Sequence, residues 1–368
     1  MAPATVLHVI EHMHLGGRET ALARLVRAMD RERFTPIVAT FLPGDLGDTL
    51  AAEGVRVVRI DARPKYRRVP ALVRLIHEQR VDLVHSHMFS GGTYGRTAAL
   101  AARARGIVHT HATLSFRERP WKTYLPEAAL TAFTDRVICV SRAVRDHLAK
   151  FMPVHRDRMI VIPNGLATDV FAPPPVRPPG FRSPPMIVGV GRLEPVKAFD
   201  VLIRALGELC RGGVDFRARL VGDGSERAAL EALARSEGVS GRVEFLGHRD
   251  DVSTLLGEAD LFVAPSHREG LSNAVLEAMG AGLPIVATRV GGNPELLDAI
   301  GGLVSPADPL AMAAEIRRTL ADPPAAHARG DAARAEIERN YTLAGVVARH
   351  QALYADVLAS SRREGAAA

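Results

Sequence analysis

The feature that most constrains the fold is a repeated alternation of short apolar segments with longer amphipathic ones. TVLHVI, DLVHSH and RVICVS have the length and the Val/Ile content of buried strands, and helical sequence lies between most such segments. The same alternation begins again at residue 186 with MIVGVGR and runs on to LFVAPS. Because apolar strands that alternate with helices form parallel sheets covered on both faces, we expect two doubly wound α/β domains.

Helical periodicity locates most of the helices expected between these strands. They span residues 18–29, 69–79, 93–103 and 142–150 in the first half, and 200–211, 225–237 and 252–258 in the second. We expect no helix between TPIVATF and VRVVRID, and nearly continuous helix after residue 324.

A proline-rich stretch separates the two alternations. Residues 173–185 read PPPVRPPGFRSPP, with proline at seven of the thirteen positions. Proline lacks the N–H that a strand needs, so this stretch cannot join a sheet interior and is expected to form a stiff linker. We therefore predict a first domain over residues 1–172 and a second over residues 186–341, for which 368 residues are sufficient.

Composition favours a cytoplasmic protein. The longest uncharged stretches, such as residues 278–288, are too short to cross a bilayer, and the first residues lack a basic leader. Cys139 and Cys210 are the only cysteines, which suits a reducing compartment.

The charge is uneven along the chain. Residues 1–172 hold 25 Lys and Arg against 16 Asp and Glu, whereas the remainder holds 22 against 25. A basic first half favours peripheral contact with the anionic inner face of the cell membrane, or an anionic acceptor. The alternative is a solvated, arginine-rich surface without a partner. We expect no nucleic acid partner.

One stretch, residues 268–296, combines several groups suited to a nucleotide ligand. It reads REGLSNAVLEAMGAGLPIVATRVGGNPEL, with Glu269 and Glu277 on either side of a loop-to-helix junction. Gly270 can bend the chain there. Ser272 can cap the following helix, whose first N–H groups then face an anion. Such a segment can hold a sugar hydroxyl, a ribose and a phosphate in one crevice.

The rest of this stretch completes a motif that resembles a known family. The helix is expected to end near residues 280–282, LPIVAT to form a buried strand, and residues 291–292 to form a tight turn. The whole stretch resembles the nucleotide-binding signature of the retaining glycosyltransferases of family 4, the group 1 glycosyltransferases. The resemblance covers nearly the full chain and implies a GT-B fold, in which two Rossmann-like domains face each other across a cleft. It also implies that a C-terminal helix, about residues 342–360, crosses back to complete the first domain.

The resemblance implies an enzyme of the hexosyltransferase type (EC 2.4). Such an enzyme moves a sugar from a nucleotide-sugar donor to an acceptor hydroxyl and retains the anomeric configuration. The first domain would bind a glycan or lipid-linked acceptor in the synthesis of cell-surface polysaccharide or glycolipid, and the second domain the donor. Arg117, Arg119, Trp121 and Lys122 favour a lipid-linked acceptor at the membrane face.

The resemblance also assigns roles within the donor loop. Glu277 would accept hydrogen bonds from the ribose. Glu269 would be catalytic, contacting the donor sugar and stabilising positive charge at its anomeric carbon. Gly270, Leu271 and Ser272 complete the donor-binding loop, and the departing phosphate would accept the acceptor's proton.

Arg192 and Lys197 follow the strand MIVGVGR, at a strand-end turn and the start of a helix. They can clamp a diphosphate, Arg192 as a fork and Lys197 as a point charge, although two solvated charges are the alternative. The family commonly has glycine after this lysine, where this chain has Ala198. The chain contains no Asp-x-Asp, so we expect metal-independent activity and no cofactor.

The same segment also carries the first spacing of a dinucleotide fingerprint, at Gly189 and Gly191. Glu194 stands where the third glycine is required, which disfavours a dehydrogenase.

Two further loops are donor-binding candidates. Gly16 and Gly17, in LGGRE, stand at a loop-to-helix turn where adjacent glycines let backbone N–H groups approach phosphate or acceptor oxygens. A tight turn without a ligand is the alternative. VEFLGHRDD resembles the family's base-binding loop, in which the backbone of Leu246 and Gly247 would contact the base. Whether the donor is a UDP- or a GDP-sugar stays open.

Paired histidines end two of the expected strands: His85 and His87 in HSHMF, and His109 and His111 in HTHATLSF. Alternate residues of a strand share a face, so either pair could bind a metal, as in a metal-dependent hydrolase. The second half offers no further ligands in order. The resemblance instead assigns one histidine to the donor sugar. His111 matches best, as a catalytic residue, and His109 is the alternative.

Two other enzyme classes share features with this site. A glycoside hydrolase uses paired carboxylates, for which Glu269 and Glu277 qualify, but a phosphate clamp argues against it. A nucleotide-sugar epimerase of GT-B architecture would use the same donor-side cleft, and activity without any acceptor would distinguish it.

Overall fold

The structure is a computed structural model that describes residues 2–14, 16–112, 114, 120–168 and 180–367. It divides into two compact units, and each is described by itself. Unit 1 is Met1–Gly165 together with Leu343–Ala368, and unit 2 is Leu166–Thr342.

The first boundary lies nearer to the N-terminus than residue 172, where the sequence predicts the first domain to end. The reason is a backbone contact within unit 2. The Leu166 N–H donates to the carbonyl oxygen of Tyr341 at 2.8 Å, and Leu166 forms an isolated parallel bridge with Thr342. The predicted linker lies outside the described residues from 173 to 179.

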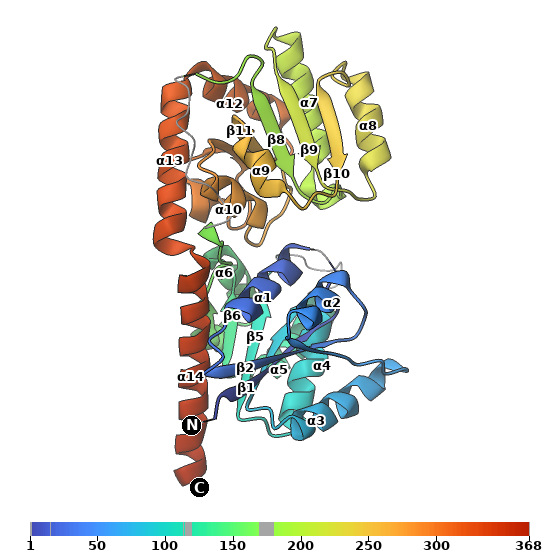
Figure 1. Cartoon of the computed structure of the whole chain (residues 1–368), viewed down its shortest axis with the longest axis vertical. Helices are drawn as coiled ribbons and strands as arrows, with labels where there is room; N and C mark the ends of the chain where they lie inside the picture. Colours follow the sequence, from blue (N-terminus) through green and yellow to red (C-terminus); the bar gives the residue numbers. More distant parts are fainter. Residues whose placement is uncertain (1, 15, 113, 115–119, 169–179, 368) are drawn as a thin grey trace. The chain divides into compact units, whose positions relative to one another are not determined.

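Unit 1 is built on a seven-stranded parallel sheet in the order β3-β2-β1-β4-β5-β6-β7 (Figure 1). Its strands are β1 (Ala4–Ile10), β2 (Phe34–Thr40), β3 (Arg56–Arg59), β4 (Leu83–His87), β5 (Gly106–His111), β6 (Arg136–Cys139) and β7 (Met159–Val161). The strand order reverses between β1 and β4. In doubly wound sheets such a reversal opens a ligand crevice at the carboxyl ends of the strands.

Helices cover this sheet. They are α1 (Gly17–Ala28), α2 (Asp45–Ala52), α3 (Arg68–Glu78), α4 (Met88–Ala101), α5 (Pro120–Thr131), α6 (Arg142–Phe151) and α14 (Leu343–Ala367). The helices α1 and α2 contact each other, as do α1 and α14, while α4 contacts both α3 and α5. A helix crossing back to this sheet is therefore present, and it runs beyond residue 360.

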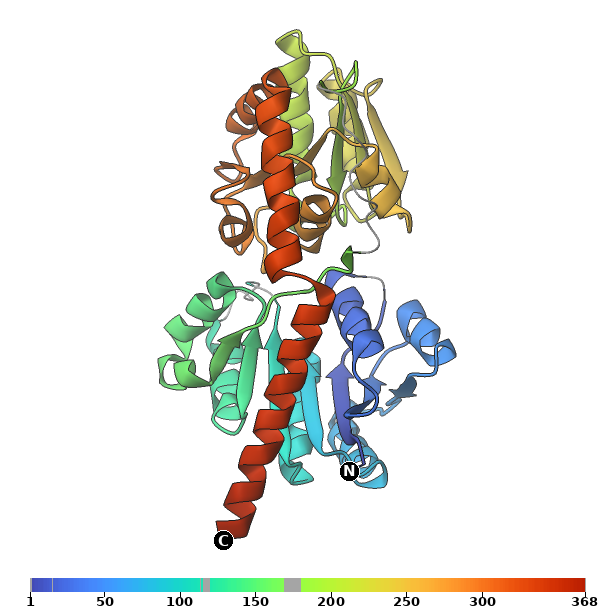
Figure 2. The ribbon, with the colours of Figure 1, turned by 60° about the vertical axis from the view of Figure 1, so that its left-hand side comes forward.

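The last helix belongs to the core of unit 1, although it is far from the sheet in sequence. Figure 2 shows α14 running along the sheet of unit 1. Its side chains Val346, Tyr354 and Val357 join one apolar cluster with Val6 and Leu83 of the central strands. These helix positions recur at helical spacing, so α14 buries one apolar stripe.

Unit 2 is built on a six-stranded parallel sheet in the order β10-β9-β8-β11-β12-β13. Its strands are β8 (Met186–Val190), β9 (Arg217–Val221), β10 (Val243–Gly247), β11 (Leu261–Ala264), β12 (Ile285–Thr288) and β13 (Gly302–Val304). Its α-helices are α7 (Phe199–Arg211), α8 (Arg227–Ser236), α9 (Val252–Gly257), α10 (Asn273–Gly280), α11 (Asn293–Leu297), α12 (Pro309–Ala321) and α13 (Pro323–Asn340). The strand order reverses between β8 and β11.

The expectation of no helix between the second and third strands is wrong, because α2 occupies that segment. Gly47 lowers its helix propensity, but Leu46 and Leu50 lie four residues apart and pack with Val38. Tertiary packing therefore decides this helix. The structure also contains α12 and β13, which are not among the expected elements.

Among the described residues, no helix combines the length and the apolar character that a membrane crossing requires.

Candidate active site

The predicted donor-binding residues fall into both units. Gly16, Gly17 and His111 belong to unit 1, whereas the remaining residues belong to unit 2. Within unit 2, the strands β8, β10 and β11 are parallel members of one sheet, so the loops that follow them emerge at the same edge. Gly247 is the last residue of β10, and the loops after β8 and β11 carry Lys197 and Glu269.

The helix α10 begins and ends as its sequence predicts. The Ser272 hydroxyl oxygen accepts the Val275 N–H at 3.4 Å, which confirms the N-cap. The helix ends at Gly280, and Gly282 follows with a φ of +69°, the left-handed conformation that terminates helices.

A short ion pair joins two of the predicted site residues. The Lys197 ammonium donates to Glu269 Oε1 at 2.6 Å, and the Ser266 hydroxyl donates to the same oxygen at 2.7 Å. The Lys197 side chain is 22% exposed and that of Glu269 is 9% exposed, so the pair lies at the rim of the unit. A backbone bond from the His267 N–H to the Val196 carbonyl oxygen holds their two loops together at 3.0 Å.

The second glycine turn packs against the first loop. Gly291 has a φ of +53°, and a Cβ atom there would collide with the carbonyl oxygen of Glu269. The Gly292 N–H donates to the Gly270 carbonyl oxygen at 3.0 Å. Position 291 therefore requires glycine, both for its positive φ and for the close approach of the two backbones.

Neutral polar side chains form hydrogen bonds to the backbone near the loop that carries Glu269. The Thr288 hydroxyl donates to the Ser266 carbonyl oxygen at 2.6 Å, and the Asn293 amide donates to the Thr288 carbonyl oxygen at 3.0 Å. Thr288, Asn293 and Ser266 are all buried, so the bonds fix the backbone that carries Glu269.

Ala198, where the family commonly has glycine, adopts a left-handed backbone conformation. Ala198 has φ +51° and ψ +41°, a left-handed conformation in which glycine has no steric penalty. The alanine adopts the conformation that the family's glycine would adopt freely.

The other predicted residues of unit 2 take distinct environments. Arg192 is exposed, Leu246 and Glu277 are half-buried, and Gly270 and Leu271 are buried. Gly247 ends β10 with a φ of +67°, and its carbonyl oxygen accepts the Gly222 N–H at 2.8 Å.

In unit 1, Gly16 and Gly17 stand at the start of α1, as the sequence predicts. Gly16 has a φ of −169°, which any residue can adopt. A Cβ atom at Gly16 would instead collide with Oε2 of the buried Glu19. A larger residue at position 16 would therefore require the Glu19 carboxylate to move.

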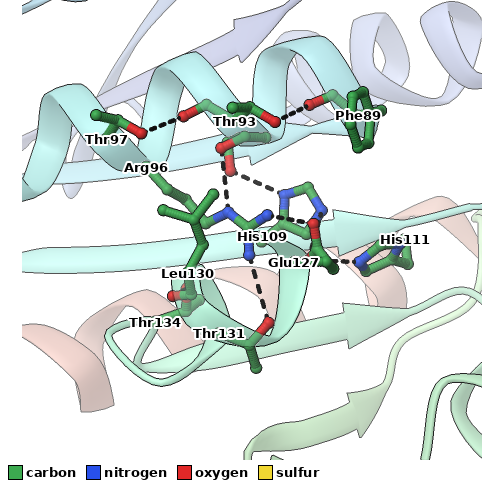
Figure 3. Close-up of polar contacts among 12 residues, drawn as sticks. Phe89, Thr93, Arg96, Thr97, His109, His111, Glu127, Leu130, Thr131 and Thr134 are labelled. Atoms are coloured by element: carbon green, nitrogen blue, oxygen red, sulfur yellow. Dashed lines mark hydrogen bonds and ion pairs between the residues drawn. The ribbon is translucent and has the colours of Figure 1, made fainter. Parts of the chain in front are cut away.

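The predicted catalytic histidine belongs to a buried polar network at the end of β5. His111 Nε2 contacts Glu127 Oε1 at 3.0 Å, and Arg96 Nη2 donates to Glu127 Oε2 at 2.6 Å (Figure 3). His109 Nε2 lies 3.9 Å from Glu127 Oε1, while its Nδ1 pairs with the Ser86 hydroxyl at 2.9 Å. Strand β5 therefore presents both histidines to one carboxylate on α5.

Electrostatics keep this network ionised at Glu127 and neutral at His109. Burial opposes the carboxylate charge, but the His111 imidazole and the Arg96 guanidinium hold the pKa of Glu127 well below its usual range. Burial, aided by the nearby Arg96 charge, lowers the pKa of His109 well below its usual value.

Two groups in the described part of unit 1 have the geometry of metal ligands. One is His8, His85 and His87, and the other is His109, His111 and Glu127. In the first group His85 already uses both ring nitrogens, with the Tyr354 hydroxyl at 2.6 Å and the Thr110 hydroxyl at 2.7 Å. In the second group the Arg96 guanidinium already forms an ion pair with the Glu127 carboxylate at 2.6 Å. Hydrogen bonds thus occupy both ring nitrogens of His85 and both oxygens of Glu127, whereas His8 Nε2 and His109 Nε2 have no hydrogen-bond partner among the described residues.

Sequence reasoning missed Arg96 and Glu127. Arg96 is the only charged residue of α4, and such a lone charge in an apolar helix signals a buried partner. Nothing local identifies that partner, which lies 31 residues further along the chain. Of the residues proposed for the acceptor, Arg117 and Arg119 lie outside the described residues, as do the side chains of Trp121 and Lys122.

Two family models match this chain. "Glycosyltransferase Family 4" matches residues 15–170, and "Glycosyl transferases group 1" matches residues 184–322. The D-inositol 3-phosphate glycosyltransferase of Actinosynnema mirum is 30% identical over 376 residues, which cover 85% of this chain and 86% of that protein. The chain belongs to glycosyltransferase family 4.

More distant relatives extend the same likeness. This family 4 chain is 29% identical over 239 residues to the phosphatidylinositol N-acetylglucosaminyltransferase GPI3 subunit of Saccharomyces cerevisiae, covering 62% of this chain and 52% of that protein. It thus spans about half the length of the yeast relative.

Solved structures show the fold. HepE of Anabaena in complex with UDP aligns over 96% of this chain and 100% of that chain, with a TM-score of 0.83 at 22% identity. A glycosyltransferase from Rickettsia africae aligns over 97% and 99%, with a TM-score of 0.84 at 21% identity. The family 4 chain therefore has the predicted GT-B fold, built from two doubly wound parallel-sheet domains.

Proposed function

We propose that this family 4 chain is a retaining glycosyltransferase that moves a sugar from a UDP- or GDP-sugar to an acceptor hydroxyl. The observation that carries the proposal is the contact of Lys197 with Glu269 beside the Ser272-capped start of α10. One loop cluster thus offers a cation, a carboxylate and a helix N-terminus. The cation and the helix N-terminus suit a diphosphate, and the carboxylate suits sugar hydroxyls.

In this proposal the Lys197 ammonium leaves Glu269 and binds the diphosphate when the donor is bound. Lys197 and Arg192 then stabilise the charge that develops on the departing diphosphate. The released Glu269 contacts the donor sugar and stabilises positive charge at its anomeric carbon. Glu277 contacts the ribose, the backbone at Leu246 and Gly247 contacts the base, and the departing phosphate receives the acceptor's proton.

In unit 1, His111 is proposed to bind a donor-sugar hydroxyl, and the loop at Gly16 and Gly17 to approach the phosphates or the acceptor. Of the two candidate histidines, His109 is fully buried whereas the His111 side chain is 17% exposed. A ligand can reach His111, and this supports its role.

The names of the similar proteins support the proposed substrates. HepE was solved with UDP and with UDP-glucose, which supports a nucleotide-sugar donor. The yeast relative is named for phosphatidylinositol and the bacterial relative for inositol phosphate. We therefore propose a glycan or lipid-linked acceptor, used in glycolipid or cell-surface polysaccharide synthesis at the cytoplasmic face of the membrane.

A thermal-shift screen against UDP- and GDP-sugars tests the donor. A ligand that binds only the folded chain stabilises it by about 2.7 kcal/mol at a hundred times its Kd, so one base should raise Tm and the other should not. Product analysis with and without acceptor then separates transfer from epimerisation. If no nucleotide sugar raises Tm, the proposed function is wrong.

Metal independence follows from using Arg192, Lys197 and a helix N-terminus in place of a divalent ion. Turnover should persist in excess EDTA. Complete loss of turnover, restored by one divalent ion, would instead favour a metal at the paired histidines.

A further inference from the structure

The two carboxylate oxygens of Glu127 have different hydrogen-bond partners, Arg96 and His111. The Glu127 side chain is 4% exposed and that of Arg96 is fully buried. Arg96 is itself fixed, since its Nε donates to the Gly92 carbonyl oxygen at 3.1 Å and its Nη1 to the Thr131 hydroxyl at 3.5 Å. Oε2 is therefore occupied by the guanidinium, and Oε1 is left for His111 (Figure 3).

The chemistry of a carboxylate determines which ring nitrogen of His111 carries the proton. An ionised carboxylate can only accept hydrogen bonds, so His111 Nε2 must be the donor across the 3.0 Å contact. In a neutral imidazole the other nitrogen is then an acceptor. In the neutral form of the ring, His111 Nδ1 therefore presents a lone pair.

His109 cannot substitute for His111 in this arrangement. It is fully buried, and a Cβ atom added at Gly92 would lie 2.6 Å from its ring. Its Nδ1 is paired with Ser86 and its Nε2 has no hydrogen-bond partner. His109 thus packs behind Glu127, while His111 lies on the exposed side.

We propose that Glu127, anchored by Arg96, is a positioning residue that fixes the ring orientation and the Nε2–H tautomer of His111. The use of His111 on a donor sugar rests on the proposed function above, whereas the tautomer depends only on this network. Because Nδ1 accepts, it suits a sugar hydroxyl and disfavours a sugar carboxylate. The proposal therefore also favours a donor whose sugar is neutral.

The Glu127→Gln variant should reverse the tautomer. Arg96 can only donate, so the amide oxygen must turn toward Arg96 and the amide NH₂ toward His111 Nε2. His111 would then carry its proton on Nδ1. Proton–nitrogen correlation spectra of isotope-labelled histidine distinguish the two tautomers, and a His111→Gln variant assigns the signal.

A matched control is Asp82→Asn, which makes the same chemical change elsewhere in unit 1. Asp82 Oδ1 accepts from Arg105 Nη1 at 2.7 Å, and its Oδ2 accepts the Thr5 N–H at 3.0 Å. We expect Nε2–H in the unaltered chain and in Asp82→Asn, and Nδ1–H in Glu127→Gln. An Nδ1–H signal in the unaltered chain, or an unchanged signal in Glu127→Gln, overturns the proposal.

If circular dichroism shows that Glu127→Gln does not fold, Glu127→Asp decides the question. The shorter side chain keeps the charge beside Arg96 but withdraws from His111, so the spectrum should show a mixture of tautomers. A single Nε2–H tautomer in Glu127→Asp overturns the proposal.

Kinetics test whether the fixed tautomer matters for turnover. Glu127→Gln should lower kcat about 10–100-fold, the same scale as the loss of a partner that orients a metal-ligating histidine. Affinity for the nucleotide diphosphate should be unchanged. A tautomer that reverses without a change in kcat overturns the positioning role. Absence of transfer by the unaltered chain counts against the proposed function alone, because the spectra still test the tautomer.

Discussion

The two units share one order over six strands, to which unit 1 adds β7, but they bury different kinds of polar residues. Among the described residues, unit 1 buries five histidines and the charged residues Glu19, Arg68, Arg96 and Glu127. The histidines are His8, His85, His87, His109 and His350. In unit 2 the buried polar side chains are neutral: Ser266, Ser272, Thr288, Asn293 and Thr319. The same topology thus accommodates a titratable core in one unit and an uncharged core in the other.

Strand pairing explains the difference. The parallel register of β1 and β4 sets His8 beside His85, and His87 follows two residues later on the same face. His8 Nδ1 contacts His87 Nε2 at 3.2 Å, and because one of the two nitrogens must accept, the two rings cannot both be protonated. In unit 2 the charged Lys197 and Glu269 stand at the rim, on loops beyond the strand ends. The comparison teaches that unit 1 should respond to pH and unit 2 to removal of its loop charges.

The largest expected effect is acid destabilisation of unit 1. Burial is the main cause that lowers the pKa of His87 to about 3 and that of His350 to about 4, and it lowers the pKa of His8, His85 and His109 well below 6.5. The unfolded chain then binds more protons than the folded chain, so stability is full above pH 6.5 and falls as pH decreases toward the folded pKa values. Between pH 7.5 and 5.5 each histidine should cost on the order of 1 kcal/mol of unfolding free energy, and the set several times that amount.

Amide hydrogen exchange, corrected for intrinsic rates, measures this loss separately in the two units. As pH decreases, protection of the amides in unit 1 should fall more steeply than protection of the amides in unit 2. A His350→Gln variant should flatten the dependence in unit 1. Equal slopes in the two units would contradict the comparison.

The next effect in size is the removal of the buried charge at Arg96. The Arg96→Met variant leaves Glu127 buried without its guanidinium, which costs about 3–5 kcal/mol of unfolding free energy. Arg27→Met is the matched control, because Arg27 pairs with Glu53 at 2.6 Å on the surface. That change should cost about 0–1 kcal/mol. Urea unfolding measures both, and similar losses would show that burial does not govern these pairs.

In unit 2 the expected loss is of turnover and not of stability. Lys197→Ala should lower turnover by roughly 10²–10³-fold, about 2.7–4 kcal/mol, if the ammonium stabilises developing phosphate charge. Arg289→Ala breaks an exposed ion pair with Asp298 in the same unit and should leave turnover unchanged. Steady-state rates at saturating donor test both variants. Undiminished turnover in a folded Lys197→Ala chain would contradict the role of Lys197 in binding the diphosphate.

The smallest effect separates the two glutamates of the donor loop. Glu277→Gln should weaken binding of the free nucleotide diphosphate by about 1.5–3 kcal/mol, the scale of a hydrogen bond to a charged group. Glu269→Gln should leave that affinity nearly intact and lower turnover of the full donor. Calorimetric titration alongside turnover measures both, and the opposite pattern would exchange the two roles.

Much of unit 2 follows from local sequence. The Ser272 cap, the end of α10 near Gly282 and the turn at Gly291 each depend on residues within one short stretch. Strand positions follow equally well, because a buried parallel strand needs a continuous apolar run. The sequence therefore determined the two-domain architecture, the family and the loop that carries Glu269.

Only the tertiary structure decided how the polar core of unit 1 is assembled. Glu127 lies 16 residues from His111 and 31 from Arg96, and His87 lies 79 residues from His8. Strand order and helix packing bring these groups together, and no local pattern encodes a partner at such separations. The helix α2 has the same cause, because burial of Leu46 and Leu50 overcomes the weak helix propensity of its sequence. Local patterns thus determine which segments form strands and capped helices, whereas partners distant in sequence are chosen by the packing of the whole unit.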